Sequence, residues 1–318
     1  MANKTSTILR RLINRDKILV IPTGGIALHA RMVEALGYDA VSISGAVAIS
    51  HILGLPDVGL VTMTEMLENI HRVCNVVNIP VIADCDTGFG NAINTRRTVQ
   101  EAIRAGAAGL HIEDQVSPKR CGFVKGKEIL SEEEAVGKYR AAIDARNEMD
   151  KDFVIIARTD ARTAVGGSLD EAIRRAKAYE KAGVDVVYIE AIQSREEIKK
   201  VRAEINCHLT CTTTAIKPRP TLQEYKELGL SLLLGYMFPS VGNVAMWDML
   251  VEAKKSGYEI FEEWHQKHID HPLVWPSFFD IVGLPQVWEM EKRYLSKKTM
   301  AKYDKSEGIY DPRKRRKL

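Results

Sequence analysis

The chain has 318 residues, of which 45% are hydrophobic and 27% are charged. This composition can bury a large core, as in a soluble globular protein with one large domain or two small ones. The formal net charge is only +3, and much of the basic excess lies in residues 313–317. Such a run could attract phosphate or act as a nuclear signal, but a solvated, frayed terminus is the favoured interpretation. We therefore expect no nucleic-acid partner.

No segment has the pattern of a secretory signal or a membrane span. Charged residues such as Arg10, Arg11 and Asp16 interrupt the N-terminal region, and no apolar run elsewhere is long enough to cross a bilayer. The five cysteines include no Cys-x-x-Cys pair, which favours reduced thiols over disulfides or a zinc site. These features predict a cytoplasmic protein with no membrane partner.

One pattern recurs along the chain: a helical segment, a small-residue turn, and a short run of aliphatic and β-branched residues. The turn contains a glycine, which suits a helix C-terminus where a left-handed backbone is needed. The near-continuous apolar runs suit strands that are buried on both faces. In chain order, we expect strands at 18–23, 40–45, 81–84, 110–113, 153–158, 186–190, 208–213 and 230–235, with helical patterns between them such as 64–77, 132–147 and 169–182.

Eight such units predict an α/β fold, a closed (β/α)8 barrel of the TIM type. A doubly wound open sheet is the alternative, but no Gly-x-Gly-x-x-Gly follows the first strand to hold a dinucleotide. We assign the barrel to residues 1–240. Residues 241–318 contain further helical patterns with several aromatic side chains, and they end in a basic tail at 312–318.

Acidic residues stand at the ends of the apolar runs. Asp84 and Asp86 follow the third run, Glu113 the fourth, Asp160 the fifth and Glu190 the sixth. Active sites of this fold lie at the C-terminal rim, and carboxylates near a core are costly unless a positive charge pairs with them. Oxygen ligands suit Mg²⁺ or Mn²⁺. One such acid alone would more simply cap a helix or pair with an arginine, but the set favours a metal site.

A polar, glycine-bearing loop at 117–127 follows the fourth strand and has the composition of a mobile lid. Within it, Lys119 and Arg120 stand beside Cys121, and we expect the two cations to favour the thiolate. A thiol with a low pKa can transfer a proton or attack carbon. The alternative is a solvated loop with an incidental cysteine, and the position of the loop at the rim favours the catalytic interpretation.

Several motifs in order resemble the isocitrate lyase and phosphoenolpyruvate mutase superfamily, and within it the short 2-methylisocitrate lyase and 2,3-dimethylmalate lyase type. The resemblance runs from about residue 9 to about residue 235. The matching elements are Ser44-Gly45, Leu-Gly-Leu-Pro-Asp-Val-Gly at 53–59, Asp-Cys-Asp-Thr-Gly-Phe-Gly at 84–90, His-Ile-Glu-Asp-Gln at 111–115, Lys-Arg-Cys-Gly at 119–122, Ala-Arg-Thr-Asp-Ala at 157–161 and Glu190-Ala191.

The resemblance implies a role for each site residue. Asp86 would bind Mg²⁺ directly, while Asp57, Asp84 and Glu113 would bind its waters; Mn²⁺ is a possible substitute. Cys121 would be the general acid and Glu190 would orient the site. The residues implied for binding the carboxylate substrate are Ser44, Gly45, Lys119, Arg120, Gly122, Arg158 and Thr213. The implied reaction is a retro-aldol, Claisen-type cleavage of a malate-like 2-hydroxy acid into an α-keto acid and a second carboxylic acid.

The sequence departs from the family pattern at three places. Phe123 stands where the lyases have histidine, Ser42 where they have a tyrosine proposed as the base, and Cys-Thr-Thr-Thr at 211–214 where they have Asn-Leu-Thr-Glu. We therefore expect a substrate that differs from methylisocitrate, with fewer carboxylates or a larger apolar group.

Rival functions stay open. Phosphonopyruvate mutase or hydrolase and oxaloacetate decarboxylase would fit the acidic cluster, but Cys121 favours a lyase, which must reprotonate a carbanion. A non-catalytic binding protein is the weakest alternative. The resemblance also implies that the C-terminal helices from residue 241 are exchanged between subunits of a homotetramer.

Overall fold

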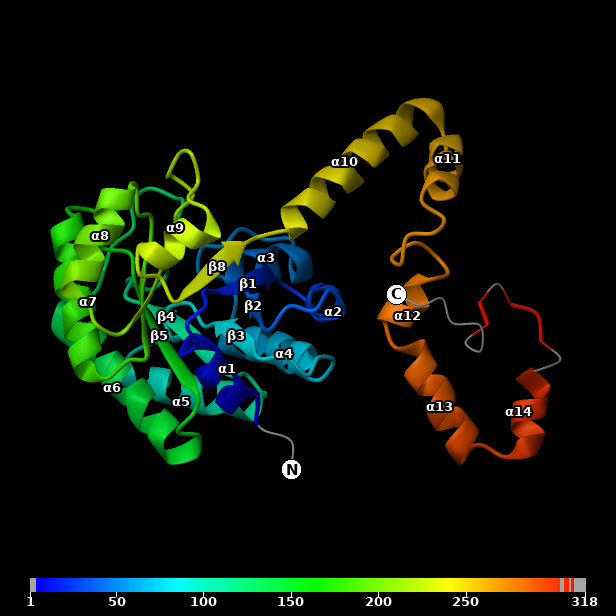
Figure 1. The fold of residues 1–318 in the computed structure, drawn as a ribbon, viewed down its shortest axis with the longest axis horizontal. Coiled ribbons are helices and arrows are strands. Elements are labelled where there is room, and N and C mark those ends of the chain that lie inside the picture. Colours follow the sequence, from blue (N-terminus) through cyan, green and yellow to red (C-terminus); the bar gives the residue numbers. More distant parts are fainter. Residues whose placement is uncertain (1–3, 304–305, 309, 312–318) are drawn as a thin grey trace. The chain divides into compact units, whose positions relative to one another are not determined.

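The computed structural model describes residues 4–303, 306–308 and 310–311, which form two compact units, Met1–Pro239 and Ser240–Leu318. The basic tail at 312–318 lies outside the described residues. The first unit is built on a single sheet of eight parallel strands (Figure 1). These are β1 (Leu19–Gly24), β2 (Val41–Ile43), β3 (Val81–Asp84), β4 (Gly109–Glu113), β5 (Val154–Thr159), β6 (Val186–Ile189), β7 (His208–Cys211) and β8 (Leu232–Tyr236).

The strands follow one another around a nearly closed barrel, so the predicted TIM-type fold is confirmed. Their order is β7-β6-β5-β4-β3-β2-β1-β8, and each registered pair is parallel. Beside β7, the backbone N–H of Ser231 donates to Leu209 O at 3.0 Å. The predicted strand boundaries were right within two residues, but Ser44 and Thr213 lie beyond the strands in which we expected them.

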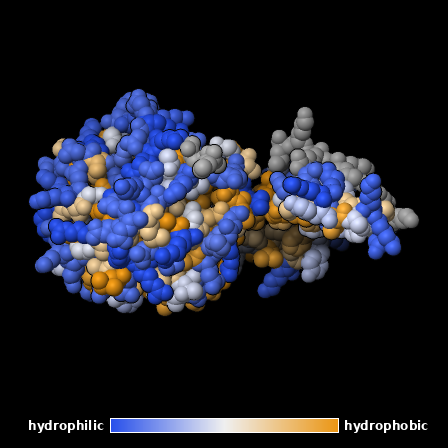
Figure 2. Space-filling view, turned by 90° about the horizontal axis from the view of Figure 1, so that it is seen from below, coloured by the Kyte–Doolittle hydropathy of each residue, from blue (hydrophilic) through white to orange (hydrophobic). Residues whose placement is uncertain are grey.

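Helices cover the outside of the barrel. They are α2 (Ala27–Ala35), α3 (Gly45–Ile52), α4 (Met63–Cys74), α5 (Ala92–Arg104), α6 (Glu132–Met149), α7 (Leu169–Ala182), α8 (Arg195–Glu204) and α9 (Leu222–Glu227). Capping boxes fix the starts of α4, α6 and α9, in which a Ser or Thr side chain and a Glu three residues later satisfy the first backbone N–H groups. The face of this unit seen in Figure 2 is mainly hydrophilic.

An additional helix, α1 (Thr5–Ile13), packs against the barrel interior. Leu9 and Ile13 are buried in the same apolar cluster as Ile21, Ile82 and Ile156. Gly109 makes this approach possible, because a Cβ there would lie 3.2 Å from Leu9 Cδ2 and 2.7 Å from Val154 O. Since α1 precedes the first strand, it supports the N-terminal end of the barrel and leaves the opposite rim to the polar residues.

The second unit consists of α10 (Pro239–Ser256), whose first residue belongs to the barrel unit, α11 (Glu259–Lys267), α12 (Phe278–Ile281), α13 (Leu284–Tyr294) and α14 (Lys297–Tyr303). Apolar side chains on α10 are exposed, among them Val244, Trp247 and Leu250. No helix among the described residues is both long and apolar enough to cross a membrane.

Candidate active site

A pocket of about 190 Å³ opens at the C-terminal ends of the strands. The residues around it come from nearly every strand end and from the loops that follow. On one wall lie Ser44, Asp57, Asp84 and Lys119; on the floor lie His111, Arg158, Tyr188 and Glu190; on the other wall lie Thr212, Thr213, Thr214, Arg219 and Leu234; and Cys121, Gly122 and Phe123 of the lid loop also contribute. The pocket therefore gathers residues that are far apart in the sequence.

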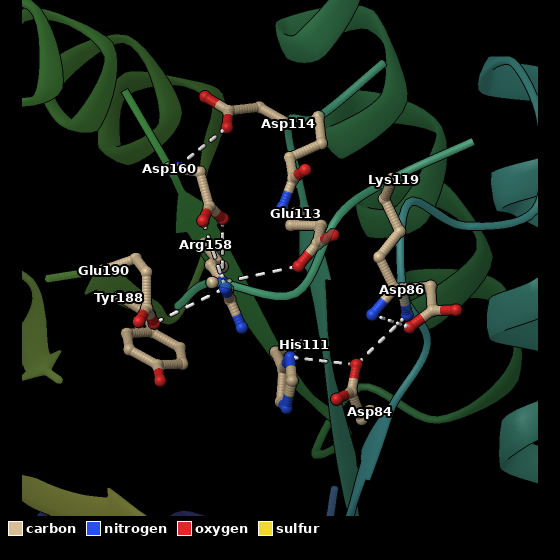
Figure 3. Close-up of polar contacts among 12 residues, drawn as sticks. Asp84, Asp86, His111, Glu113, Asp114, Lys119, Arg158, Asp160, Tyr188 and Glu190 are labelled. Carbon is tan, nitrogen blue, oxygen red and sulfur yellow. Dashed lines mark hydrogen bonds and ion pairs between the residues drawn. The ribbon is translucent and has the colours of Figure 1, made fainter. Parts of the chain in front are cut away.

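The first group in this pocket is a lysine held by two carboxylates. Lys119 Nζ contacts Asp57 Oδ1. The same nitrogen lies 3.1 Å from Asp86 Oδ1 (Figure 3). Burial alone would lower the pKa of Lys119, but the surrounding carboxylates, Glu113 and Asp86 first among them, raise it instead. Lys119 is therefore a firmly charged ammonium that neutralises the acidic wall, by which we mean the carboxylates of Asp57, Asp84, Asp86 and Glu113. Of these, Asp57 and Asp84 line the pocket itself.

Asp84 and Asp86 lie together at the end of β3. Asp84 Oδ2 accepts the Gly45 N–H at 2.8 Å, and its Oδ1 accepts the Asp86 N–H at 3.1 Å. Burial raises the pKa of Asp86 to about 6, and the neighbouring Asp84 adds to the effect. The backbone of Asp86 has a φ of 45°, a left-handed conformation that non-glycine residues rarely adopt and that is concentrated at functional sites.

Arg158 is the centre of the second group. Its Nε donates to Asp160 Oδ2 at 2.9 Å and lies 3.4 Å from Glu113 Oε2, and its Nη2 lies 3.5 Å from Glu190 Oε2 (Figure 3). Burial opposes the charge, but Asp160 and Glu190 keep the pKa of Arg158 above its ordinary value. The guanidinium also lies over the ring of Tyr188, 5.4 Å from its centroid. These contacts leave a fixed cation on the pocket floor.

The lid loop is folded onto this arginine. A Cβ at Gly122 would lie 2.7 Å from Arg158 Nη2 and 2.8 Å from Glu190 Oε1, so only glycine permits the observed approach. Lys127, 1% exposed, donates to Gly122 O at 2.7 Å and to Asp160 Oδ1 at 3.0 Å. A buried lysine thus joins the backbone of the lid to the carboxylate that holds Arg158.

The pKa of Cys121 contradicts our expectation of a stabilised thiolate. Burial raises the pKa of this thiol, and the charge of nearby Asp57 acts in the same direction. A backbone hydrogen bond from Phe123 and the charges of Lys119 and Arg158 act the other way, but they do not cancel the effect of burial. The side chain of Arg120 is exposed and does not line the pocket. The thiol is therefore protonated at neutral pH, as an acid has to be before it donates.

The acidic wall fits a hard divalent cation. Its donors are carboxylate oxygens, and Glu113 Oε1 is buried without a hydrogen-bond partner, which leaves an acceptor for a metal-bound water. Within the described part of the chain, no three His, Cys, Asp or Glu residues are close enough together to hold a metal by themselves. One direct carboxylate ligand, with the other acids reached through water, is the arrangement that Mg²⁺ favours.

The remaining residues expected in the site differ in how they are placed. Ser44 caps α3 and lines the pocket, whereas the Gly45 N–H is already bound to Asp84. Thr213 lines the opposite wall, with its hydroxyl 2.6 Å from Tyr225 OH. The Arg120 backbone is held by the side chain of Gln115, which shapes the lid.

Four residues that we did not single out complete the site. His111 and Tyr188 pack edge to face on the floor, and burial lowers the pKa of His111, which keeps it neutral. Lys127 and Arg219 are the other two. A cation directly after a glycine in the lid was a signal for Lys127, whereas a surface arginine in a long loop carries no signal in the sequence.

Comparison with known proteins shows the family to which the chain is related. Residues 9–254 match the family model for phosphoenolpyruvate phosphomutase. The chain is 38% identical to the 2,3-dimethylmalate lyase of Eubacterium barkeri, over 92% of this chain and 99% of that protein. It is also 38% identical to the 2-methylisocitrate lyase of Aeropyrum pernix, over 87% of this chain and 86% of that protein. The names of these relatives support a carbon–carbon lyase.

Solved structures of other enzymes are similar as well. An oxaloacetate acetylhydrolase in complex with 3,3-difluorooxalacetate has a TM-score of 0.81 and 29% identity, covering 93% of this chain and 99% of that one. A phosphonopyruvate hydrolase in complex with oxalate and Mg²⁺ has a TM-score of 0.78 and 27% identity, covering 92% of this chain and 100% of that one. The chain belongs to the phosphoenolpyruvate phosphomutase family, within the PEP mutase/isocitrate lyase superfamily.

Proposed function

We propose that the protein is a magnesium-dependent carbon–carbon lyase. It cleaves a 2-hydroxy di- or tricarboxylic acid of the 2-methylisocitrate or 2-alkylmalate type into an α-keto acid such as pyruvate and a second carboxylic acid. The observation that carries this proposal is that the thiol of Cys121 lines the same pocket as Arg158 and the acidic wall. The names of the 2,3-dimethylmalate and 2-methylisocitrate lyases support the same reaction.

The keto-acid end of the substrate would lie between the acidic wall and Arg158. Arg158 offers a guanidinium and Ser44 a hydroxyl, and both can bind a carboxylate. Asp86 would hold the metal directly, and Asp57, Asp84 and Glu113 would hold it through water. A bound divalent cation supplies electrostatic stabilisation of the negative charge that develops on the keto-acid oxygen.

Proton movements would complete the reaction. The proton of the 2-hydroxyl leaves as the C2–C3 bond breaks, and Ser42 offers no group that is basic at neutral pH, so a carboxylate of the pocket has to accept it. The electron pair of the broken bond stays on the second fragment. Cys121 then donates its proton to that carbon, which its raised pKa favours because the thiol is held in the protonated form.

The test is to incubate the protein with Mg²⁺ and either a 2-alkylmalate or 2-methylisocitrate. A coupled lactate dehydrogenase assay measures the α-keto acid that is released. We expect turnover by the wild-type protein and a loss of roughly a hundredfold or more in Cys121→Ser. Folding of the variant is checked by circular dichroism and by unchanged binding of oxalate. Full activity in Cys121→Ser would remove the thiol from the mechanism.

Hydrolysis of oxaloacetate is a second candidate, favoured by the similar structure of an oxaloacetate acetylhydrolase. Oxaloacetate carries a carboxylate next to a carbonyl, so its keto-acid end would fit the same contacts with Arg158 and Ser44. Oxalate and acetate as products would identify this reaction. Turnover of phosphonopyruvate would instead indicate the mutase or hydrolase chemistry.

We also propose that the protein is a homotetramer in which the C-terminal helices contact another subunit. Exposed apolar side chains on α10, such as Val244, Trp247 and Leu250, support this proposal, because apolar patches of this kind usually mark an interface. Light scattering coupled to gel filtration measures the mass in solution. A monomer of 35.6 kDa would contradict the proposal.

A further inference from the structure

The wall of the pocket opposite the acidic residues carries two unused hydrogen-bond donors. In a ring of eight strands, β7 lies four positions from β3, so the loop between β7 and α9 faces the acidic wall across the pocket. Thr214 and Arg219 of this loop line the pocket. The two donors therefore face the part of a substrate that lies farthest from Asp84 and Asp86.

Arg219 differs from the other cations that line the pocket in its lack of a partner among the described residues. Three residues with permanent positive charges line it: Lys119, Arg158 and Arg219. Lys119 is paired with Asp57 and Asp86, and Arg158 is paired with Asp160, Glu113 and Glu190. Arg219 makes no ion pair or hydrogen bond with any residue that the structure describes, and the same holds for the Thr214 hydroxyl.

Position distinguishes Arg219 from an ordinary solvated arginine. Lys217, two residues earlier on the same loop, is equally exposed but does not line the pocket. Arg219 is followed by Pro220, which is buried and lines the pocket beside it. A guanidinium and a hydroxyl on one loop match the two oxygens of a carboxylate.

Apolar side chains line the pocket with this pair, as do the hydroxyl groups of Thr212, Thr213 and Tyr225. Leu233 and Leu234 of β8, Pro220, Met237 and Phe123 line the pocket with it. These side chains suit short alkyl groups and leave no further unpaired cation among the described lining residues for another carboxylate. A third carboxylate on the substrate would therefore find no unpaired cation among these described lining residues, which is costly for a buried charge.

We propose that Arg219 and Thr214 bind the carboxylate on carbon 3 of the substrate, and that the substrate is an alkyl-substituted 2-hydroxy dicarboxylate and not a tricarboxylate. The proposal rests on the lyase function proposed above. When the C2–C3 bond breaks, its electron pair moves onto carbon 3 and is delocalised into that carboxylate, while the 2-hydroxyl loses its proton and becomes a carbonyl. Arg219 lies where this charge develops, and the thiol of Cys121 then protonates carbon 3.

The experiment compares Arg219→Gln, Arg219→Lys and Thr214→Val with the matched control Lys217→Gln. With 2,3-dimethylmalate and Mg²⁺, we expect Arg219→Gln to lower kcat/KM roughly 10- to 100-fold, as for a lost charge-assisted hydrogen bond. Thr214→Val should lose less, Arg219→Lys should recover part of the activity, and Lys217→Gln should match the wild type. The inhibition constant of oxalate, which occupies the keto-acid side, should change less than about twofold.

Two results would overturn the proposal. One is an unchanged kcat/KM in Arg219→Gln, and the other is a tricarboxylate such as 2-methylisocitrate turned over as efficiently as the dicarboxylate by the wild type. If the wild type released no keto acid from any 2-hydroxy acid, the lyase function would fail by itself. Calorimetry would then decide the role of Arg219. Propionate should bind to the wild type in the presence of oxalate and Mg²⁺. Weaker binding of propionate to Arg219→Gln would support the subsite, and equal binding would refute it.

Discussion

The two walls of the pocket are built in opposite ways. On the acidic wall, Asp84, Asp86 and Lys119 are buried and bound to one another. On the wall after β7, Thr214 and Arg219 keep their donors free of partners within the described chain. A buried, mutually bound wall is organised before the substrate arrives, and such preorganisation favours the chemical step. An open wall with free donors is suited to selecting the substrate.

The largest effect is expected at Asp86 of the acidic wall. Replacing it by alanine removes the proposed direct ligand of the metal, and we expect Mg²⁺ affinity to fall by at least about a hundredfold, since even supporting residues of metal sites cost 10- to 100-fold. Calorimetric titration of Mg²⁺ in the presence of oxalate measures the loss. Equal Mg²⁺ binding by Asp86→Ala and the wild type would move the metal elsewhere.

The second largest effect is expected at Lys127, which is buried although it stands in the lid loop. Lys127→Met leaves Gly122 O without its donor and deprives Asp160 of one of its two cations, so we expect a loss of about 3 kcal/mol in the free energy of unfolding. Urea denaturation measures it. Lys125→Met is the control, because Lys125 is exposed on the same loop. Equal stability of the two variants would show that the buried contact is dispensable.

A smaller effect is expected on the pH dependence of the reaction of Cys121 with alkylating reagents. Because burial raises the pKa of the thiol above its ordinary value, the thiolate fraction at pH 8 is smaller than in a free cysteine. The rate of iodoacetamide alkylation should therefore keep rising above pH 9. Cys121→Ser provides the background from the other four cysteines. A plateau reached below pH 8 would restore the thiolate interpretation.

The smallest effect is expected at Thr213, which belongs to the open wall but has a partner. Its hydroxyl lies 2.6 Å from Tyr225 OH. Thr213→Val should cost about 1 kcal/mol in stability, as for an ordinary hydrogen bond, and change kcat/KM for 2,3-dimethylmalate only a few-fold. A loss larger than that of Arg219→Gln would give Thr213 the role that we propose for Arg219.

The periodic features of the sequence predicted the fold well. Glycine turns before apolar runs located four of the eight strands, and the apolar runs alone located the other four, because strands buried on both faces have an unbroken apolar pattern. The end of β2 was misjudged at Ser44, since a serine can continue a strand or cap a helix, and here it accepts the Val47 N–H as an N-cap. The packing of α1 against the barrel depends on the lack of a side chain at Gly109, which a one-dimensional pattern does not reveal.

The site was predictable where residues follow a strand and less so elsewhere. Asp84, Asp86 and Glu113 stand at strand ends, so the barrel geometry alone brings them together. The prediction of an acidic thiol at Cys121 was wrong because its pKa depends mainly on burial, which the neighbouring cations in the sequence do not reveal. Arg219 lies eight residues beyond β7, where no periodicity fixes the direction of a side chain.

Asp114 has a consequence for motion during turnover. Its carboxylate, 1% exposed, accepts Tyr179 OH at 2.7 Å, Thr159 Oγ1 at 2.8 Å and the Asp160 N–H at 3.0 Å. These bonds tie the end of β5 to α7 among buried side chains, where breaking them is expensive. The end of β5, which carries Arg158, therefore has little freedom to shift, and we expect any movement that admits small acids to come from the loops around the pocket instead of the strand ends.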